Sequence, residues 1–250
     1  NKEYYAKMRT QSGAEITKEY SISPIKDSKS KITGMVIVFR DYTVKKKKQE
    51  KIEYMSYHDP LTGIYNRRYF DEQIIELDKE ENLPLTIIYA DINGLKLAND
   101  LKGHATGDKL IKLAASSIKK ELRTNDIFSR IGGDEFGIVL PQTGAEAAGL
   151  LIERIRASLE DKKVEGISLS ISFGYATKYK PEEKISSIIT DSDSNMYSNK
   201  ITESAIFKKN TIIDFRNALE NKHSMTLEDK LRTKKICDVA MIEMGIKGDE

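Results

Sequence analysis

The sequence predicts an α/β (α+β) protein in which helices surround a central mixed, mainly antiparallel sheet. Amphipathic helical patterns alternate with buried strand-like runs from residue 59 onward. The pair Gly132-Gly133 lies between two apolar runs, a pattern typical of a two-residue β-hairpin whose turn needs positive φ. Short strand-like runs precede this region, and only helical patterns follow it. We therefore also expect a short N-terminal antiparallel β segment and a C-terminal helical tail.

Residues 1–44 contain three strand-like runs separated by polar turns, at Tyr4–Thr10, Glu15–Ile25 and Ile32–Arg40. Three short strands rarely form a core of their own, so this segment looks like the end of a larger domain. Residues 45–57 begin with four lysines and predict a solvated helical linker. The alternative is a patch for anionic membranes, but no second membrane anchor accompanies it.

The period of the apolar residues defines the elements of the central region. A helical period predicts helices, and short apolar runs predict buried strands. We expect helices at Phe70–Glu81, Asp108–Leu122, Thr143–Leu159 and Pro181–Asn199, and strands at Leu85–Ala90, Asp126–Ile131, Glu135–Leu140 and Ile167–Ala176. The polar segment from Asn99 to Asp108 is expected to be a loop in which Asp108 caps the following helix. Residues 211–250 are expected to form two further helices, Thr211–Asn221 and Leu227–Met244.

The composition excludes several classes of protein. The 41 Lys and Arg residues nearly balance the 39 Asp and Glu residues, so a protein that coats nucleic acid is not expected. One cysteine, Cys237, cannot form an internal disulfide, which fits a reducing compartment. No apolar run approaches the ~20 residues that span a bilayer, and no signal-peptide pattern begins the chain. We expect a cytoplasmic protein, and a first residue that is Asn rather than Met suggests a piece of a longer one.

Two acidic positions are candidates for metal binding. Asp91 ends a buried apolar strand, a frequent place for ligand sites in α/β folds, although a simple turn residue would also fit there. Asp134 and Glu135 follow the glycine pair, where a ligand can approach the backbone closely. If Asp91 and Asp134 lie on adjacent strands, their carboxylates could share Mg²⁺, but the spacing alone does not establish this adjacency.

The polar segment between these positions is a candidate for binding a guanine base. A carboxylate such as Asp108 can accept hydrogen bonds from the ring N–H and the amino group of guanine, and the Asn99 amide can complement the base edge. Lys96 lies nearby in the sequence and could neutralise phosphate charge. Helix capping alone would also account for Asp108.

Taken in order, these features resemble the GGDEF family, the diguanylate cyclases. The resemblance runs from residue 58 to residue 208 and implies a nucleotidyl-cyclase-like fold there. The motifs that carry it are Asp59–Arg68, Asp91–Asp108, the signature within Arg130–Phe136, Ser170–Ala176 and Asp193–Lys200. Residues 1–44 resemble the C-terminal strands of a PAS sensor domain, and residues 209–250 faintly resemble the start of an HD-GYP phosphodiesterase domain.

The resemblance implies a role for each matching residue in making cyclic di-GMP from two GTP molecules. Asp134 would be the base for the ribose 3′-hydroxyl, and Lys96 would stabilise charge on the phosphates in the transition state. Mg²⁺ or Mn²⁺ would be held by Asp91, the backbone carbonyl of Ile92, Asp134 and Glu135. The substrate would be bound by Asn99, His104, Asp108 and Lys200. Because each subunit would hold one GTP, two chains must meet as a homodimer.

The same resemblance implies inhibition by the product, cyclic di-GMP. The family's Arg-x-x-Asp motif matches Arg123 and Asp126 ahead of the signature, and Arg154 on the next predicted helix is a second candidate contact. An ordinary surface arginine and a strand-start aspartate are the alternative. The chain departs from the family at Asn93, where a second Asp is common, and at Ser204, where many relatives carry a phosphate-contacting Arg. Lys208 or Lys209 are candidates to replace that arginine.

Three functions remain open from the sequence. The chain is expected to be an active diguanylate cyclase, and the intact Asp134-Glu135 pair favours this. The alternative is a catalytically weak module that binds GTP or cyclic di-GMP as a regulatory domain. A cyclase for another cyclic nucleotide is the third, and Asp108 argues against it because its carboxylate would repel the ring acceptor of adenine.

Overall fold

The computed structural model describes residues 3–9, 13, 15–221 and 231. The chain divides into two compact units, with the boundary between Ser56 and Tyr57. Apart from Leu231, the helix expected at Leu227–Met244 lies outside the described residues. None of the helices within the described ranges is long and apolar enough to cross a membrane.

The first unit is a three-stranded antiparallel sheet followed by a helix. The strands β1 (Glu3–Arg9), β2 (Glu15–Lys26) and β3 (Ile32–Asp41) pair in sequence order, as expected. Helix α1 (Thr43–Tyr57) follows, also as expected. Large apolar side chains of this sheet are exposed, among them Met35 and Phe39. The PAS interpretation of this segment stays a prediction.

The second unit contains a five-stranded sheet; the sequence predicts four of its strands and misses the short strand Tyr65–Asn66. Its strand order is β10-β5-β7-β6-β4, and every neighbouring pair is antiparallel except β4 with β6. The strands are β4 (Tyr65–Asn66), β5 (Leu85–Ile92), β6 (Ile127–Arg130), β7 (Glu135–Leu140) and β10 (Ile171–Lys178). A separate two-stranded pair, β8 (Lys163–Val164) and β9 (Ile167–Ser168), precedes β10. The predicted mixed, mainly antiparallel sheet is confirmed.

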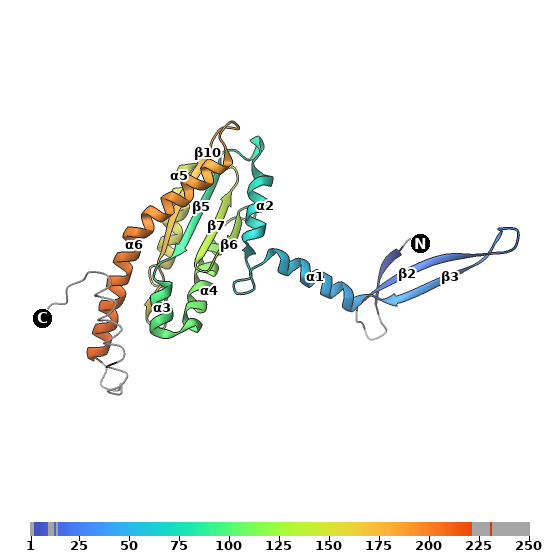
Figure 1. The fold of residues 1–250 in the computed structure, drawn as a ribbon, viewed down its shortest axis with the longest axis horizontal. Coiled ribbons are helices and arrows are strands. Elements are labelled where there is room, and N and C mark those ends of the chain that lie inside the picture. Colours follow the sequence, from blue (N-terminus) through green and yellow to red (C-terminus); the bar gives the residue numbers. More distant parts are fainter. Residues whose placement is uncertain (1–2, 10–12, 14, 222–230, 232–250) are drawn as a thin grey trace. The chain divides into compact units, whose positions relative to one another are not determined.

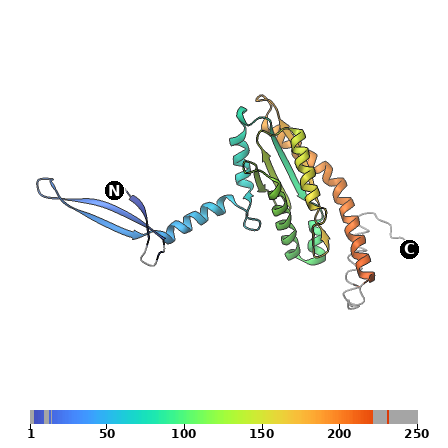
Figure 2. The ribbon, with the colours of Figure 1, turned by 180° about the vertical axis from the view of Figure 1, so that it is seen from behind.

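Helices cover both faces of this sheet, as Figures 1 and 2 show. They are α2 (Arg67–Leu77), α3 (Leu95–Lys102), α4 (His104–Glu121), α5 (Ala145–Leu159) and α6 (Ile185–Asn221), with a short 3₁₀ turn at Glu80–Asn82. Alternate residues of a strand point to opposite faces. Ile88 and Ala90 of β5 therefore pack in the core under α4 and α5, whereas Ile87 packs in the core under α2 and α6. By the same alternation, Asp91 lies on the α6 face.

The segment from Asn99 to Asp108 is helical, so the expected loop is wrong. Helix α3 ends at Lys102, and α4 already begins at His104 after Gly103, whose φ is 87°. Asp108 consequently lies inside α4 and does not cap it. Four of the eight residues of α3 are apolar, but three of them precede the polar segment that begins at Asn99, and only Ala98 is fully buried.

The expected two-residue hairpin with positive φ is also wrong. Neither Gly132 nor Gly133 is among the residues with positive φ. The Ile131 N–H donates to the Glu135 carbonyl over 2.9 Å, which leaves three residues, Gly132 to Asp134, in the turn. Because the turn is longer, Gly132 and Gly133 do not need the left-handed backbone conformation. The longer turn also places Asp134 on the loop instead of on β7.

Helix α6 is continuous from Ile185 to Asn221, although the sequence predicts two separate helices in this range. Its early turns lie directly against β10. A Cβ atom at Gly174 would be 1.9 Å from the Met196 nitrogen, so only glycine permits this close approach of helix and strand. The approach brings the next turn of α6, which carries Lys200, over the end of β5.

Candidate active site

Asp91 is a buried carboxylate at the end of β5. Its side chain is fully inaccessible, and its Oδ2 atom accepts a hydrogen bond from Lys200 Nζ on α6 at 2.5 Å. Its Oδ1 atom has no hydrogen-bond partner among the described residues. Burial raises the pKa of Asp91 to about 6; the Lys200 hydrogen bond opposes this increase and the charge of Asp134 adds to it. A buried oxygen without a partner is costly unless a cation or a donor completes the site.

The turn between β6 and β7 brings two further carboxylates to this position. Glu135 stands directly opposite Asp91 in the antiparallel register of β5 and β7. The carbonyl of Asp134 accepts the N–H of Ile92 over 3.1 Å. The strand adjacency that the sequence could not establish is therefore present, and Asp91, Ile92, Asp134 and Glu135 are brought together at one edge of the sheet.

The chemistry of these groups fits a divalent metal. In the described part of the chain, no three His, Cys, Asp or Glu side chains are arranged as a ready-made metal site. The Lys200 ammonium pairs with Asp91 instead. Mg²⁺, however, is usually bound by one or two carboxylates together with substrate phosphates and waters. The free Oδ1 of Asp91 and the neighbouring acidic loop meet that requirement.

The acidic loop is held by an arginine that the sequence reasoning missed. Arg130 Nη1 donates to both carboxylate oxygens of Asp59, at 3.2 and 3.1 Å, and Arg130 Nη2 donates to the Gly133 carbonyl at 2.7 Å. Asp59 in turn accepts from the Thr62 N–H and hydroxyl. Burial alone would raise the pKa of Asp59, but the hydrogen bonds from Thr62 and Arg130 hold it below its usual value. The sequence signal for this turn was the spacing of Asp59 and Thr62, because an aspartate often closes a turn by accepting hydrogen bonds from a residue two or three positions later.

The two residues expected to read guanine lie where α3 packs against α4. The Asn99 Oδ1 atom is buried without a hydrogen-bond partner in the described structure, and it lies 2.1 Å from the position of a Cβ atom on Gly107. Asp108, the next residue after Gly107, is exposed. His104, also exposed, begins α4, and Lys96 is exposed in the first turn of α3. An unpaired amide oxygen beside an exposed carboxylate offers a complementary edge to a base.

Asn93, which departs from the family pattern, has a structural role. It is 2% exposed, and its amide lies 3.0 Å from the hydroxyls of both Ser170 and Ser172. Ser172 donates to Glu203 over 2.6 Å, and Glu203 pairs with Arg156. The Asn93 Nδ2 donates to the Ser170 hydroxyl and its Oδ1 accepts from the Ser172 hydroxyl, which therefore lies between the Asn93 amide and Glu203. An aspartate at position 93 would place a second carboxylate close to Glu203, with only the Ser172 hydroxyl between the two negative charges.

The Arg123 and Asp126 pair borders a separate cavity of about 360 Å³. The Arg123 N–H donates to Asp126 Oδ2 over 2.7 Å, so the Arg-x-x-Asp motif closes its own turn. Burial raises the pKa of Asp126, while the Arg123 hydrogen bond acts in the opposite direction. Arg154 is not among the residues that line this cavity, and its guanidinium pairs with Glu121 at the end of α4. The structure therefore brings Arg123 and Asp126 to one cavity and does not bring Arg154 there.

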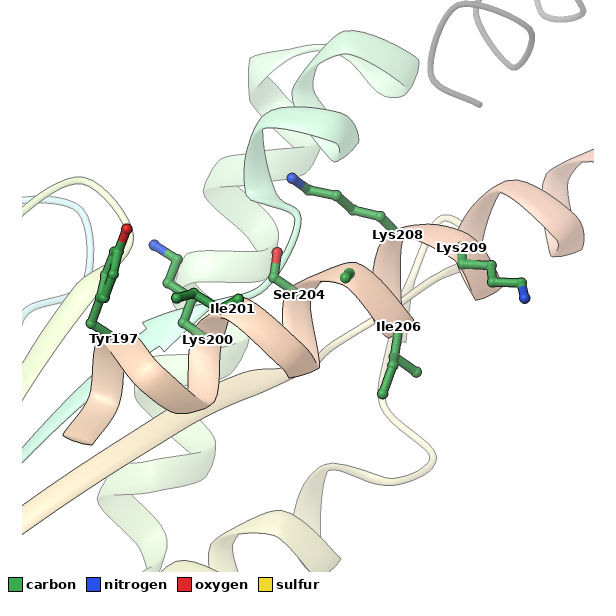
Figure 3. A pocket seen from close by; sticks show the side chains of 8 residues that line it. Tyr197, Lys200, Ile201, Ser204, Ile206, Lys208 and Lys209 are labelled. Carbon is green, nitrogen blue, oxygen red and sulfur yellow. The ribbon is translucent and has the colours of Figure 1, made fainter. Parts of the chain in front are cut away.

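A groove of about 540 Å³ runs along α6 and is lined by residues between Tyr197 and Lys209 (Figure 3). Lys200, Ser204 and Lys208 follow one another at four-residue intervals on its wall. Lys200, which lines the groove, also pairs with the buried Asp91, so this part of α6 lies next to the end of β5.

A family model described as "Diguanylate cyclase, GGDEF domain" matches residues 56–205. This chain belongs to the GGDEF family. It is 32% identical over 157 residues to "Probable diguanylate cyclase DgcE" of Escherichia coli K12, a match that covers 62% of this chain and 14% of that protein. It is 33% identical over 173 residues to "Cyclic di-GMP phosphodiesterase PdeB" of Shewanella oneidensis, covering 66% and 20%. The chain thus spans a fifth or less of the length of these two relatives.

Among solved structures, the GGDEF domain of this chain is similar to the coiled coil and GGDEF domain of DgcB from Caulobacter crescentus, in complex with c-di-GMP. The TM-score is 0.58 at 25% identity, and the match covers 64% of this chain and 88% of that one.

Proposed function

We propose that this chain is a diguanylate cyclase that condenses two GTP into cyclic di-GMP and two pyrophosphates. The observation that carries the proposal is the buried Asp91, whose Oδ1 atom has no partner in the described structure, directly opposite Glu135 of the signature loop. Such a site calls for a cation, and a nucleoside triphosphate carries its metal with it.

In this proposal the residues of the signature loop act on the ribose. Asp134 accepts the proton of the 3′-hydroxyl of one GTP. The 3′-oxygen then forms a bond to the α-phosphorus of the second GTP, the bond from that phosphorus to the bridging oxygen breaks, and pyrophosphate leaves. The same step with the roles of the two nucleotides exchanged closes the ring and releases the second pyrophosphate. Lys96 and Lys200 provide positive charge for the phosphates, and Asn99, His104 and Asp108 hold the guanine end.

Asp91, Asp134, Glu135 and the Ile92 carbonyl would hold Mg²⁺ or Mn²⁺, which supplies electrostatic stabilisation for charge on the phosphate oxygens. Lys200 would exchange its bond with Asp91 for contact with a phosphate when the nucleotide arrives. The chain needs no basic surface for this, because the metal brings the positive charge to the site.

The reaction joins two nucleotides, whereas one domain offers one guanine site. We therefore propose a catalytic homodimer in which two domains face each other. GTP is a cytoplasmic nucleotide, and the proposal places the domain in the cytoplasm. We also propose that cyclic di-GMP inhibits the enzyme through Arg123 and Asp126, with its guanine or phosphate on the Arg123 guanidinium.

The deciding experiment is incubation of the protein with GTP and Mg²⁺, followed by chromatographic separation of the products. We expect cyclic di-GMP and pyrophosphate from the parent and none from Asp134→Ala. A parent that forms no cyclic dinucleotide at high protein concentration contradicts the cyclase proposal, and activity in Asp134→Ala contradicts the assignment of the base. For inhibition, Arg123→Ala should keep its activity at product concentrations that stop the parent, whereas equal inhibition of both rejects the site.

The second candidate is a module that binds GTP or cyclic di-GMP without turnover. The Asp91–Lys200 ion pair favours it, because the Lys200 ammonium already neutralises the carboxylate that would hold the metal. The matching segment in a protein named a phosphodiesterase is in keeping with such a role. Nucleotide binding without product in the same incubation would identify this function.

A further inference from the structure

The groove along α6 contains a lysine that the described structure leaves without a partner. Lys208 is half-buried, and among the described residues it makes no hydrogen bond or ion pair. Lys200, eight residues earlier, is by contrast bound to Asp91. A lysine ammonium that lines a groove without a counter-charge is typical of a site that receives an anion.

The position of Lys208 follows from helix geometry. Residues four apart lie on the same side of a helix, so Lys200, Ser204 and Lys208 form one row about 12 Å long. Figure 3 shows the amines of Lys200 and Lys208 on the same side of α6, with the Ser204 hydroxyl between them. The amine of Lys209 points away from that side (Figure 3).

The neighbouring residue fixes this part of α6 against the turn that follows Asp91. The ring of Phe207 lies 2.5 Å from the position of a Cβ atom on Gly94, which only glycine can accommodate at its φ of 68°. Gly94 precedes α3, and no side chain caps the first turn of that helix. Phe207 thus holds the next residue, Lys208, near a helix N-terminus, where backbone N–H groups also favour negative charge.

We propose that Lys208 binds the terminal phosphates of the nucleotide and that Ser204 contributes a hydroxyl between Lys208 and Lys200. This rests on the proposed GTP site and adds a residue and a direction to it: the triphosphate extends from Asp91 along α6. Because Ser204 carries no charge, Lys208, one helical turn later, supplies the positive charge for the distal phosphates.

The test measures binding apart from turnover. The ligand is 3′-deoxy-GTP, which lacks the nucleophilic hydroxyl, compared with 3′-deoxy-GMP, which lacks the distal phosphates. Both are titrated calorimetrically in Mg²⁺ into the parent, Lys208→Met and Lys209→Met. We expect Lys208→Met to bind the triphosphate about tenfold more weakly, because one charge-assisted contact is lost, and to bind the monophosphate as the parent does. Lys209→Met, a matched loss of one lysine on the next position, should bind both as the parent does.

Two further variants separate charge from shape. Lys208→Arg should retain most of the triphosphate affinity, and Ser204→Lys combined with Lys208→Met should recover it by moving the charge one turn. Circular dichroism and thermal unfolding of each variant verify that the fold is intact.

The inference is overturned if Lys208→Met binds the triphosphate like the parent, if it weakens both ligands equally, or if Lys209→Met shows the same loss. A parent that does not prefer the triphosphate also overturns it. If instead the preference depends on Lys208 but GTP gives no cyclic di-GMP, the inference stands and the cyclase proposal fails.

Discussion

Arg130 and Asp59 form an ion pair across 71 positions of the sequence, and both side chains are only 15% exposed. The same guanidinium donates to the Gly133 carbonyl, so the pair connects the turn at the start of the domain to the acidic loop between β6 and β7. The geometry of the loop that carries Asp134 therefore depends on a contact outside the loop.

Replacing Arg130 by alanine should destabilise the domain by about 2 kcal/mol, because the half-buried Asp59 carboxylate loses its counter-charge. Chemical denaturation of the parent and the variant measures this. Arg67→Ala is the matched control, since its pair with Asp71 is exposed and longer, at 3.8 Å, and should cost less than about 0.5 kcal/mol. Equal effects of the two substitutions would contradict the structural role of Arg130.

The raised pKa of Asp91 makes a prediction about pH. Its pKa rises from a usual 3.8 to about 6, so between these values the folded protein binds more protons than the unfolded chain. The contribution of Asp91 to the stability of the metal-free parent therefore falls as pH rises through this window. Asp91→Asn removes this titration. Relative to the parent, the variant should gain about 2 kcal/mol in free energy of unfolding between pH 4.5 and pH 7.

Denaturation curves in the presence of a chelator at both pH values test this. Asp71→Asn, at an exposed carboxylate, controls for the loss of one negative charge. A difference between Asp91→Asn and the parent that stays constant with pH, or that moves in the opposite direction, would contradict the burial of an ionised Asp91.

The sequence predicted what depends on local pattern. The apolar runs of β5 and β7 located the sheet to within about two residues, because buried strands need consecutive apolar side chains. The positions of Asp91 and Asp134 at the ends of those runs followed from the same pattern. Helix α3 was missed because three of its four apolar residues precede the polar segment that begins at Asn99, and eight residues give only about two turns in which to recognise a period.

What could not be predicted depends on contacts between distant residues. The spacing of 109 residues between Asp91 and Lys200 contains no information about the 2.5 Å distance between their charged atoms. The resemblance assigned Lys200 to the substrate, and the structure adds that it neutralises Asp91. Likewise, the polar segment around Gly107 did not indicate that two helices pack there. Nor did it indicate that Asn99 fills the space that a Cβ atom on Gly107 would occupy.

Gly107→Ala should impair guanine binding more than it impairs folding. The added methyl would overlap Asn99 Oδ1, the end of a side chain that can move, while alanine favours the helix by about 1 kcal/mol. We expect a change in unfolding free energy of less than about 1 kcal/mol. The affinity for GTP should nevertheless fall about tenfold because the amide leaves its position. Gly149→Ala in α5 is the matched helix-interior control, and a loss of affinity there as well would indicate a general effect.

Asp108→Asn should change which base is accepted. The Asp108 carboxylate can accept from both the ring N–H and the amino group of guanine, whereas an amide offers one acceptor and one donor. The donor would face the guanine amino group, so the affinity for GTP should fall by at least about 100-fold.

Xanthosine triphosphate has a carbonyl oxygen in place of that amino group and can accept from the new amide. The variant should therefore bind xanthosine triphosphate better than GTP, while the parent shows the reverse order. Competition binding of the two nucleotides measures both orders, with Asp100→Asn on α3 as the control for charge. A variant that weakens both nucleotides equally would show that Asp108 supports the site without contacting the base.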